Sequence, residues 1–310
     1  MKSIIIVNNS LNGYASGYAA WKKYGNDAVY FVYRGEQPPT DIDKCTKVYL
    51  LDFSYPEEVM TDIANKSAYV TVIINNKTDV LTERLGFITK ENTTCLDHDS
   101  SSCVTAWQHF HVKNKAPKPL LLVQDIALES YSMRDSRDFL EGMIVEGYKD
   151  GYLQWDLISQ DDYFLNILIN KGRIINVYKE NVVDEFVKTH KPQYVNYGNL
   201  RAALFNSTNF TTEIADRILD TIPDVDFTVG YQILDSGIYF DFKSRDDRNL
   251  SINGRQVDLK SKKDYNLSML VLAAKYGGSG DENNANCIRS SDTPSHANIN
   301  SIIAGLLSID

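Results

Sequence analysis

The sequence predicts an α/β protein in which a parallel-sheet domain is joined by a long helix to a smaller α/β domain. In the first ~130 residues, short apolar runs alternate with helical patterns, as they do in βαβ units. From residue 161 to residue 188, apolar positions then recur at three-, four- and seven-residue steps, which is typical of an amphipathic helix. We therefore expect a first domain over 1–190, including the connector helix, and a second over 191–310.

The N-terminal elements follow from local patterns. Apolar, β-branched runs predict strands at 3–7, 28–33, 47–52, 70–74 and 86–89. A helix is expected over 13–24, where small residues permit close packing on the sheet, and another over 101–111. Pro56 followed by Glu57 and Glu58 predicts a helix start, because proline and acidic side chains suit the first turn.

The second domain is expected to repeat this mixture. Its predicted strands are 193–197, 227–233 and 238–243, and its predicted helices are 211–221 and 268–276. Asp235-Ser236-Gly237 has the residue types of a hairpin turn between the last two strands.

Bulk composition excludes several classes of protein. The chain has 310 residues, 43% hydrophobic, and no apolar run near the ~20 residues that span a bilayer. Its formal charge of -9 argues against broad affinity for duplex nucleic acid, although a small basic pocket for a phosphate is compatible with this charge.

The first apolar run is too short for a signal peptide. The four cysteines (Cys45, Cys95, Cys103, Cys287) lack metal-ligand spacing, so we expect reduced thiols in the cytoplasm.

Three apolar strands in the first domain end in polar residues. Asn9, Asn12 and Gly13 follow the first strand, Asp52 follows the third, and Asn75-Asn76-Lys77 follows the fourth. Because the carboxyl ends of parallel strands share one edge, this pattern predicts a site there.

In spacing and flanks these blocks resemble the DHH phosphoesterase family with its associated C-terminal substrate-binding domain. Asn12 stands where the family's first motif has an Asp, and Ile74-Asn75-Asn76 stands where Asp-His-His gives the family its name. Val123-Gln124-Asp125 is similar to the fourth motif, an Asp after an apolar run. In the second half, 242–245 resembles the family's Arg-Ser step and 277–281 its glycine-rich loop.

The resemblance implies a dinuclear site, usually manganese, that hydrolyses phosphodiesters. Only Asp52 and Asp125 survive as carboxylates, and a neutral amide oxygen is a poorer ligand for Mn²⁺. We therefore expect no metal and no other cofactor. An alternative is a metal-dependent phosphodiesterase with a rearranged manganese or magnesium site, in which Asp52, Asp125, Asp99 and His98 take part. His98 is then a relocated ligand or a general acid; otherwise it is a loop residue beside helix-capping Asp and Ser.

The preferred hypothesis is a catalytically degenerate protein that binds a nucleotide-type phosphate ligand between its domains without hydrolysis. The ligand class (cyclic dinucleotide, short oligonucleotide or nucleotide) is implied by the family, and sequestering or sensing a nucleotide signal would be its role. The expected binding residues offer amide, backbone or charged donors: Asn9, Asn12, Gly13, Asn75, Asn76, Lys77, Lys243, Ser244, Arg245, Gly277, Gly278 and Gly280.

Two other hypotheses remain open. A metal-free interaction scaffold would use a protein partner or a second copy of the chain, with no membrane association. In the second hypothesis the site has simply lost its metal ligands, and the polar residues that remain there have no role. In the binding hypothesis, Tyr14, Tyr33 and Tyr55 are candidates for stacking on a base.

Overall fold

The computed structural model describes residues 1–75, 92–148, 151–197, 200–234 and 237–245, and the backbone of strand segments 251–252, 255–256, 279–280 and 284–289. For Asp97, His98 and Tyr197 it likewise describes only the backbone. The chain forms two compact units, Met1–Val177 and Tyr178–Asp310. Helix α8 (Asp162–Thr189) crosses this division, because its first half packs in the core of unit 1 and its second half in that of unit 2.

Unit 1 contains a five-stranded sheet, entirely parallel, in the order β2-β1-β3-β4-β5. Its strands are β1 (Lys2–Asn8), β2 (Ala28–Tyr33), β3 (Thr46–Leu51), β4 (Tyr69–Asn75) and β5 (Thr93–His98). The sequence predicted the first four within a residue or so at each end. It missed β5, whose residues Thr-Thr-Cys-Leu-Asp-His lack an apolar run.

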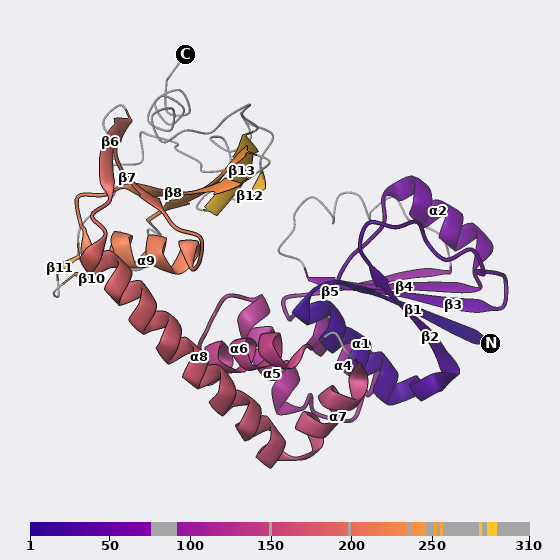
Figure 1. Ribbon diagram of the computed structural model, residues 1–310. Coiled ribbons are helices and arrows are strands. Elements are labelled where there is room, and N and C mark those ends of the chain that lie inside the picture. Colours follow the sequence, from indigo (N-terminus) through magenta and orange to yellow (C-terminus); the bar gives the residue numbers. More distant parts are fainter. Residues whose placement is uncertain are drawn as a thin grey trace. The chain divides into compact units, whose positions relative to one another are not determined.

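Alternating side chains of the sheet enter two separate cores. Ile5 and Val7 face α1 (Leu11–Tyr24) and α4 (Ser102–Phe110), whereas Ile4 and Ile6 lie in the core that includes residues of α2 (Glu57–Lys66). Figure 1 shows α2 on one face of the sheet and α1 and α4 on the other. This three-layer arrangement is the expected one for a parallel sheet buried on both faces.

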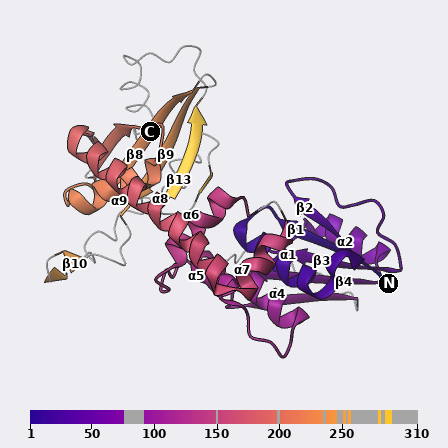
Figure 2. The same ribbon diagram turned by 60° about the horizontal axis from the view of Figure 1, so that its bottom comes forward.

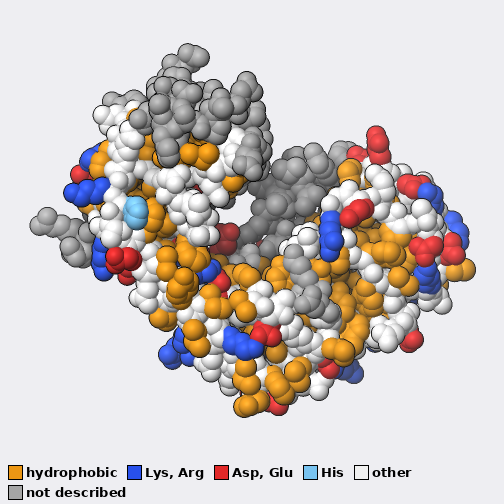
Figure 3. Space-filling view, in the orientation of Figure 1, with side chains coloured by type: hydrophobic (Ala, Val, Ile, Leu, Met, Phe, Trp, Pro, Cys, Tyr) orange, Lys and Arg blue, Asp and Glu red, His pale blue; other side chains and the backbone are white. Residues whose placement is uncertain are grey.

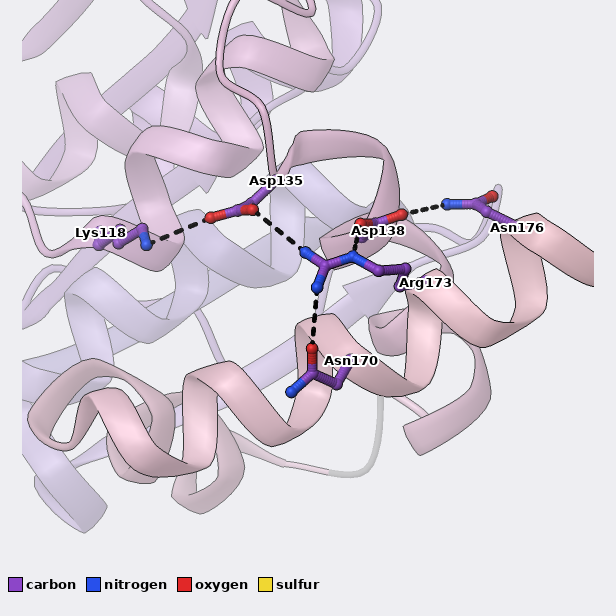
Figure 4. Close-up of polar contacts among 6 residues, drawn as sticks. All are labelled: Lys118, Asp135, Asp138, Asn170, Arg173 and Asn176. Carbon is purple, nitrogen blue, oxygen red and sulfur yellow. Dashed lines mark hydrogen bonds and ion pairs between the residues drawn. The ribbon is translucent and has the colours of Figure 1, made fainter.

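The described part of unit 1 has four further helices: α5 (Lys118–Ala127), α6 (Ser136–Glu146), α7 (Tyr152–Gln160) and the first half of α8. Helices α6 and α8 approach so closely that a Cβ on Gly172 would lie 1.7 Å from the carbonyl oxygen of Asp138. Arg173 of α8 donates to Asp138 at 2.9 Å and pairs with Asp135, which also meets Lys118 (Figure 4). These contacts fix α8 on α6.

Unit 2 contains a six-stranded mixed sheet in the order β12-β13-β9-β8-β7-β6. Its strands are β6 (Gln193–Tyr197), β7 (Leu200–Asn206), β8 (Phe227–Leu234), β9 (Gly237–Ser244), β12 (Ser279–Gly280) and β13 (Asn284–Arg289), and β10 (Ser251–Ile252) pairs separately with β11 (Arg255–Gln256). Among the described pairs of neighbouring strands in this sheet, only β7 and β8 are parallel, and the crossover helix α9 (Thr211–Thr221) connects them. Figure 2 shows β8, β9 and β13 side by side.

Most predicted elements of unit 2 are present at the expected positions. The predicted segments 86–89 and 268–276 and the turn residues Asp235 and Ser236 lie outside the described residues. Among the helices of the described chain, none combines the length and apolar character needed to cross a membrane.

Candidate functional site

The strand register brings three predicted strand ends to one level. Val7 pairs with Leu51 and Leu51 pairs with Ile73, so Asn8, Asp52 and Ile74 follow side by side at the carboxyl edge. Strand order reverses between β1 and β3, since β2 lies on one side of β1 and β3 on the other. Open α/β sheets bind ligands at such a switch point.

Asp52 lies at this switch point in a left-handed backbone conformation, with φ of 69°. Aspartate is among the few residue types that adopt this conformation at modest energetic cost. Its backbone N–H donates to the carbonyl oxygen of Ile73 at 2.8 Å, which holds the turn against β4. The turn directs the carboxylate toward the loop between β1 and α1.

The carboxylate of Asp52 accepts hydrogen bonds from three side chains: one at the end of β1, one in the loop and one at the start of α1. Asn12 Nδ2 donates to Oδ1 at 2.6 Å, while Ser10 Oγ at 2.6 Å and Asn8 Nδ2 at 3.3 Å donate to Oδ2. Both carboxylate oxygens are therefore engaged by neutral donors. These contacts join β1, α1 and β3 at one point.

The orientation of the Asn12 amide is fixed by a second contact. Asn12 Oδ1 accepts from the backbone N–H of Cys103 in the first turn of α4, at 3.1 Å. A backbone N–H only donates, so the atom facing it must be the amide oxygen and the NH₂ group must face Asp52. Asn12 thus links the Asp52 carboxylate to the N-terminal end of α4.

Gly13 has a packing role in this loop. A Cβ at this position would lie 2.2 Å from the carbonyl oxygen of Asn8, so only glycine lets α1 approach the end of β1 this closely. Its N–H donates to the Ser10 hydroxyl at 2.9 Å, which caps α1. Gly13 is buried, and its N–H would have to leave Ser10 to bind an anion.

Burial dominates the electrostatics of the carboxylate. It raises the pKa of Asp52, and the hydrogen bonds from Ser10, Asn8 and Asn12 oppose that shift only in part. The Ser102 side chain is fully buried near Asp52, and its hydroxyl forms no hydrogen bond of normal geometry. The polar hydroxyl nevertheless favours the ionised carboxylate and so lowers the pKa of Asp52. Burial raises the pKa of the nearby Cys103 thiol to about 12, so this cysteine is a neutral core residue.

The donor set around Asp52 does not fit a pair of divalent metals. A cation beside Oδ1 would meet the Asn12 NH₂ group, a donor, instead of a second carboxylate. In the described part of the chain, no three His, Cys, Asp or Glu side chains gather closely enough to hold a metal ion.

Asp125 lies within α5, where its carboxylate is enclosed by the loop that follows. It is 4% exposed and accepts from Ser130, Ser132, Ser136 and the backbone N–H of Met133. Burial raises the pKa of Asp125, but the serine hydrogen bonds outweigh it and hold the pKa far below its ordinary value. To act as a metal ligand, Asp125 would have to leave these partners.

The other predicted residues of unit 1 are only partly described. Asn9 is exposed directly beside the Asp52 site, and Asn75 ends β4 opposite His98 of β5, whose side chain is not described. Asn76 and Lys77 lie outside the described residues. Asp99 is exposed after β5.

In unit 2 the predicted basic residues have partners within the unit. Lys243 pairs with Asp216 at 2.5 Å. The Arg245 guanidinium donates to the carbonyl oxygens of Ile222 and Val225, at 3.0 and 3.1 Å, beyond the C-terminal end of α9. Ser244 ends β9, and Gly280 lies in β12, whereas Gly277 and Gly278 lie outside the described residues. A phosphate would have to compete with these internal contacts.

Two of the three candidate stacking residues are buried. Tyr14 packs edge-on against Tyr148, and Tyr55 is 7% exposed. Tyr33, at the end of β2, is partly exposed and stacks on Phe53 at 4.4 Å between ring centroids. Tyr33 is therefore the candidate that remains for contact with a base.

Three residues that surround the Asp52 carboxylate were not predicted from the sequence: Asn8, Ser10 and Ser102. A serine immediately before a helical pattern is a typical N-cap, and this signal identifies Ser10. Nothing in the local pattern indicates that Ser102 at the start of α4, 50 residues after Asp52, approaches the Asp52 carboxylate.

No family model matches the sequence, and the search of curated proteins gave no match. Several solved structures are similar in fold at low sequence identity. The pGpG-specific phosphodiesterase PggH from Vibrio cholerae has 11% identity and a TM-score of 0.50, over 99% of this chain and 97% of that one. RecJ from Thermus thermophilus with Mn²⁺ has 11% identity and a TM-score of 0.51, over 99% of this chain but 51% of that one.

A manganese-bound exonuclease RecJ has 10% identity and a TM-score of 0.50, over 98% of this chain and 89% of that one. At about 10% identity these likenesses establish the fold. They agree with the five-stranded parallel sheet of unit 1 and the mixed sheet of unit 2. The chain therefore has the α/β fold of DHH-family structures, as its sequence motifs indicated.

Proposed function

We propose that this protein binds a nucleotide-type phosphate ligand at the β1/β3 switch point without hydrolysing it. The observation that carries the proposal is the Asn12 amide, which is fixed by Cys103 so that its NH₂ group meets the Asp52 carboxylate. If position 12 were an aspartate, two carboxylates would face each other and a metal ion would have to bridge them. In this protein the hydrogen bond from the Asn12 amide to Asp52 takes the place of that metal ion. In a two-metal site the nucleophile for phosphodiester hydrolysis is a water activated by the metal ions. Asn12 and Asp52 do not form a site for a metal pair that could activate such a water.

The location and surroundings support ligand binding. The site lies where strand order reverses, beside the exposed amide of Asn9 and the partly exposed ring of Tyr33. An amide donates to a phosphate without the repulsion that a carboxylate adds. The similarity to a pGpG-specific phosphodiesterase suggests a linear or cyclic dinucleotide as the first ligands to test.

A melting-temperature screen against mono-, di- and cyclic dinucleotides, with and without Mn²⁺, tests the proposal. At a hundredfold excess over the dissociation constant a ligand adds about 2.7 kcal/mol of stability. We expect an upward shift that does not need Mn²⁺, with the ligand recovered intact by mass spectrometry. Manganese-dependent loss of ligand mass would instead support the rearranged phosphodiesterase.

A charge variant at the exposed edge locates the binding site. Asn9→Asp places a negative charge beside the phosphate, and an opposing interaction of about 1 kcal/mol at 4 Å in water weakens binding roughly fivefold. Asn166→Asp, at an exposed position of α8, is the matched control and should leave affinity unchanged. Equal affinities of the two variants would place the ligand elsewhere.

The interaction-scaffold hypothesis has one observation in its favour. Helices α6 and α7 of unit 1 carry exposed apolar side chains, among them Ile144, Val145, Leu153 and Leu157. Exposed apolar side chains that form a continuous patch are typical of proteins that bind other proteins. If no nucleotide shifts the melting temperature, this second function becomes the better proposal.

A further inference from the structure

One face of helix α8 is apolar and turned to solvent. Tyr163 is 66% exposed, Ile167 37%, Ile174 72% and Val177 52%. With Asn170, also exposed, these residues recur at alternating four- and three-residue steps. Figure 3 shows hydrophobic side chains at several places along the edge formed by α8. We call these five residues the α8 seam.

The opposite face of α8 packs in the core of unit 1. Leu165, Leu168 and Ile169 are buried there, and Gly172 meets the backbone of α6. Arg173 adds its contacts with Asp135 and Asp138 (Figure 4). The helix therefore cannot rotate to bury the α8 seam against its own unit.

The spacing of the seam is that of a helix that packs against another helix. Steps of three and four residues place apolar side chains at successive a and d positions of a heptad, with β-branched Ile167 and Ile174 at a. Asn170 is the one polar member of the seam, and its side-chain oxygen accepts from Arg173 of the same helix at 3.1 Å. We propose that the α8 seam binds the same seam of a second copy of this chain, in antiparallel orientation.

The seam is self-complementary in that orientation. Around a two-fold axis at residue 172, Ile167 meets Val177 of the partner subunit and Asn170 meets Ile174 of the partner subunit. Such an isologous contact closes after two copies. The flanking cations do not oppose it, because Lys171 pairs with Glu146 and Arg173 pairs with Asp138 within each chain.

The exposed area is sufficient for a specific dimer. A whole aromatic side chain buries roughly 200 Å², and Ile and Val somewhat less, so the exposed fractions along this face give on the order of 600 Å² per chain. The residues counted are the apolar seam members Tyr163, Ile167, Ile174 and Val177, with Phe164 and Tyr178 at the e positions beside them. Two copies together reach the roughly 1,000 Å² that a specific interface needs. The dimer is independent of the phosphate site.

Sedimentation velocity over a range of micromolar concentrations tests the proposal with the full chain. The wild-type mass should rise from 35.1 kDa toward twice that value. Ile174→Glu, which places a charge on the seam at an exposed position, should weaken the dimer at least tenfold. Val112→Glu, at an 84% exposed position before α5, is the matched control and should dimerise like the wild type.

A charge-swap pair tests the orientation. An equimolar mixture of Ile174→Glu and Asn170→Lys chains should form a heterodimer tighter than either homodimer, because the introduced carboxylate faces the introduced ammonium group only in the antiparallel register. A wild type that stays monomeric at all concentrations, or an Ile174→Glu chain that dimerises as the wild type does, overturns the proposal. A mixture that shows no rescue overturns the antiparallel register.

Discussion

Replacing Asn12 by aspartate should make the stability of the protein depend on a divalent metal. In the wild type, Asn12 Nδ2 donates to Asp52 Oδ1 at 2.6 Å. In Asn12→Asp an anionic oxygen takes the place of that donor, while the other oxygen still accepts from Cys103. Two partly buried carboxylates then face each other, which is the arrangement that a bound cation stabilises.

The magnitude follows from charge repulsion and its relief by protonation. At about 3 Å and an effective dielectric constant of about 20, two like charges repel by about 5 kcal/mol. Protonating one carboxyl relieves this, at a cost of about 4 kcal/mol at pH 7 for a group of ordinary pKa. Unfolding free energy should therefore fall by about 4 kcal/mol at pH 7, which lowers Tm by roughly 8–16 °C.

Thermal melting with and without Mn²⁺ measures this effect. Asn12→Asp should regain most of its lost Tm in excess Mn²⁺, and it should also be less destabilised at pH 5. The uncharged control Asn12→Ala loses the same hydrogen bonds, about 1–3 kcal/mol, but Mn²⁺ and low pH should not restore it. Wild-type Tm should not respond to Mn²⁺.

Two results would refute the reasoning. If Asn12→Asp melts like the wild type at pH 7 without metal, the amide does not face Asp52 in solution. If the wild type itself gains stability from Mn²⁺, a metal site exists that the Asn12 hydrogen bonds do not preclude.

Three further substitutions test the contacts around the site and on α8, each by urea denaturation. Gly13→Ala brings a Cβ to 2.2 Å from the Asn8 carbonyl oxygen, and Gly172→Ala brings one to 1.7 Å from that of Asp138; each should destabilise by about 1–3 kcal/mol, and an unchanged midpoint would contradict the close helix packing. Asp125→Asn should lose about 3 kcal/mol, because an NH₂ group then faces hydrogen-bond donors. Since the folded-state pKa of Asp125 lies below its unfolded value, its contribution is full above about pH 4 and disappears as the pH falls through the folded pKa. The difference in stability between the wild type and Asp125→Asn should therefore shrink steadily as the pH falls below about 4, and a difference as large at pH 2 as at pH 7 would contradict this explanation.

Periodicity predicted most of the fold because most elements carry their own pattern. The helix predicted over 211–221 is α9, and the strand predicted over 28–33 is β2, each with the same bounds. Most residues of strand β5 are polar or small, so the strand has no apolar pattern of its own. Its place in the sheet depends on pairing with β4, which a local pattern does not show. Helices α6 and α7 were also not predicted, because their apolar residues do not recur in a clear helical pattern and their positions depend on packing in the folded unit.

The sequence predicted that Asn12 and Asp52 meet at the sheet edge, but not the contacts that they make there. Asn12 and Asp52 were both expected at the sheet edge, and the structure joins them directly. The sequence could not show that Cys103 orients the Asn12 amide, because that contact depends on how α4 packs beside α1. Asp125 illustrates the converse: its spacing matched a ligand motif, whereas its side-chain partners are Ser130 and Ser132 of the adjoining loop and Ser136 of α6.

The aromatic core of unit 1 gives the protein a built-in spectroscopic label. All three tryptophans of the chain, Trp21, Trp107 and Trp155, stack around the buried ring of Tyr18. Tryptophan emission therefore reports the integrity of unit 1 alone, whereas far-ultraviolet circular dichroism sums the secondary structure of both units. If the two signals change at different urea concentrations, the units unfold in separate steps; if they coincide, the continuous α8 helix transmits unfolding from one unit to the other.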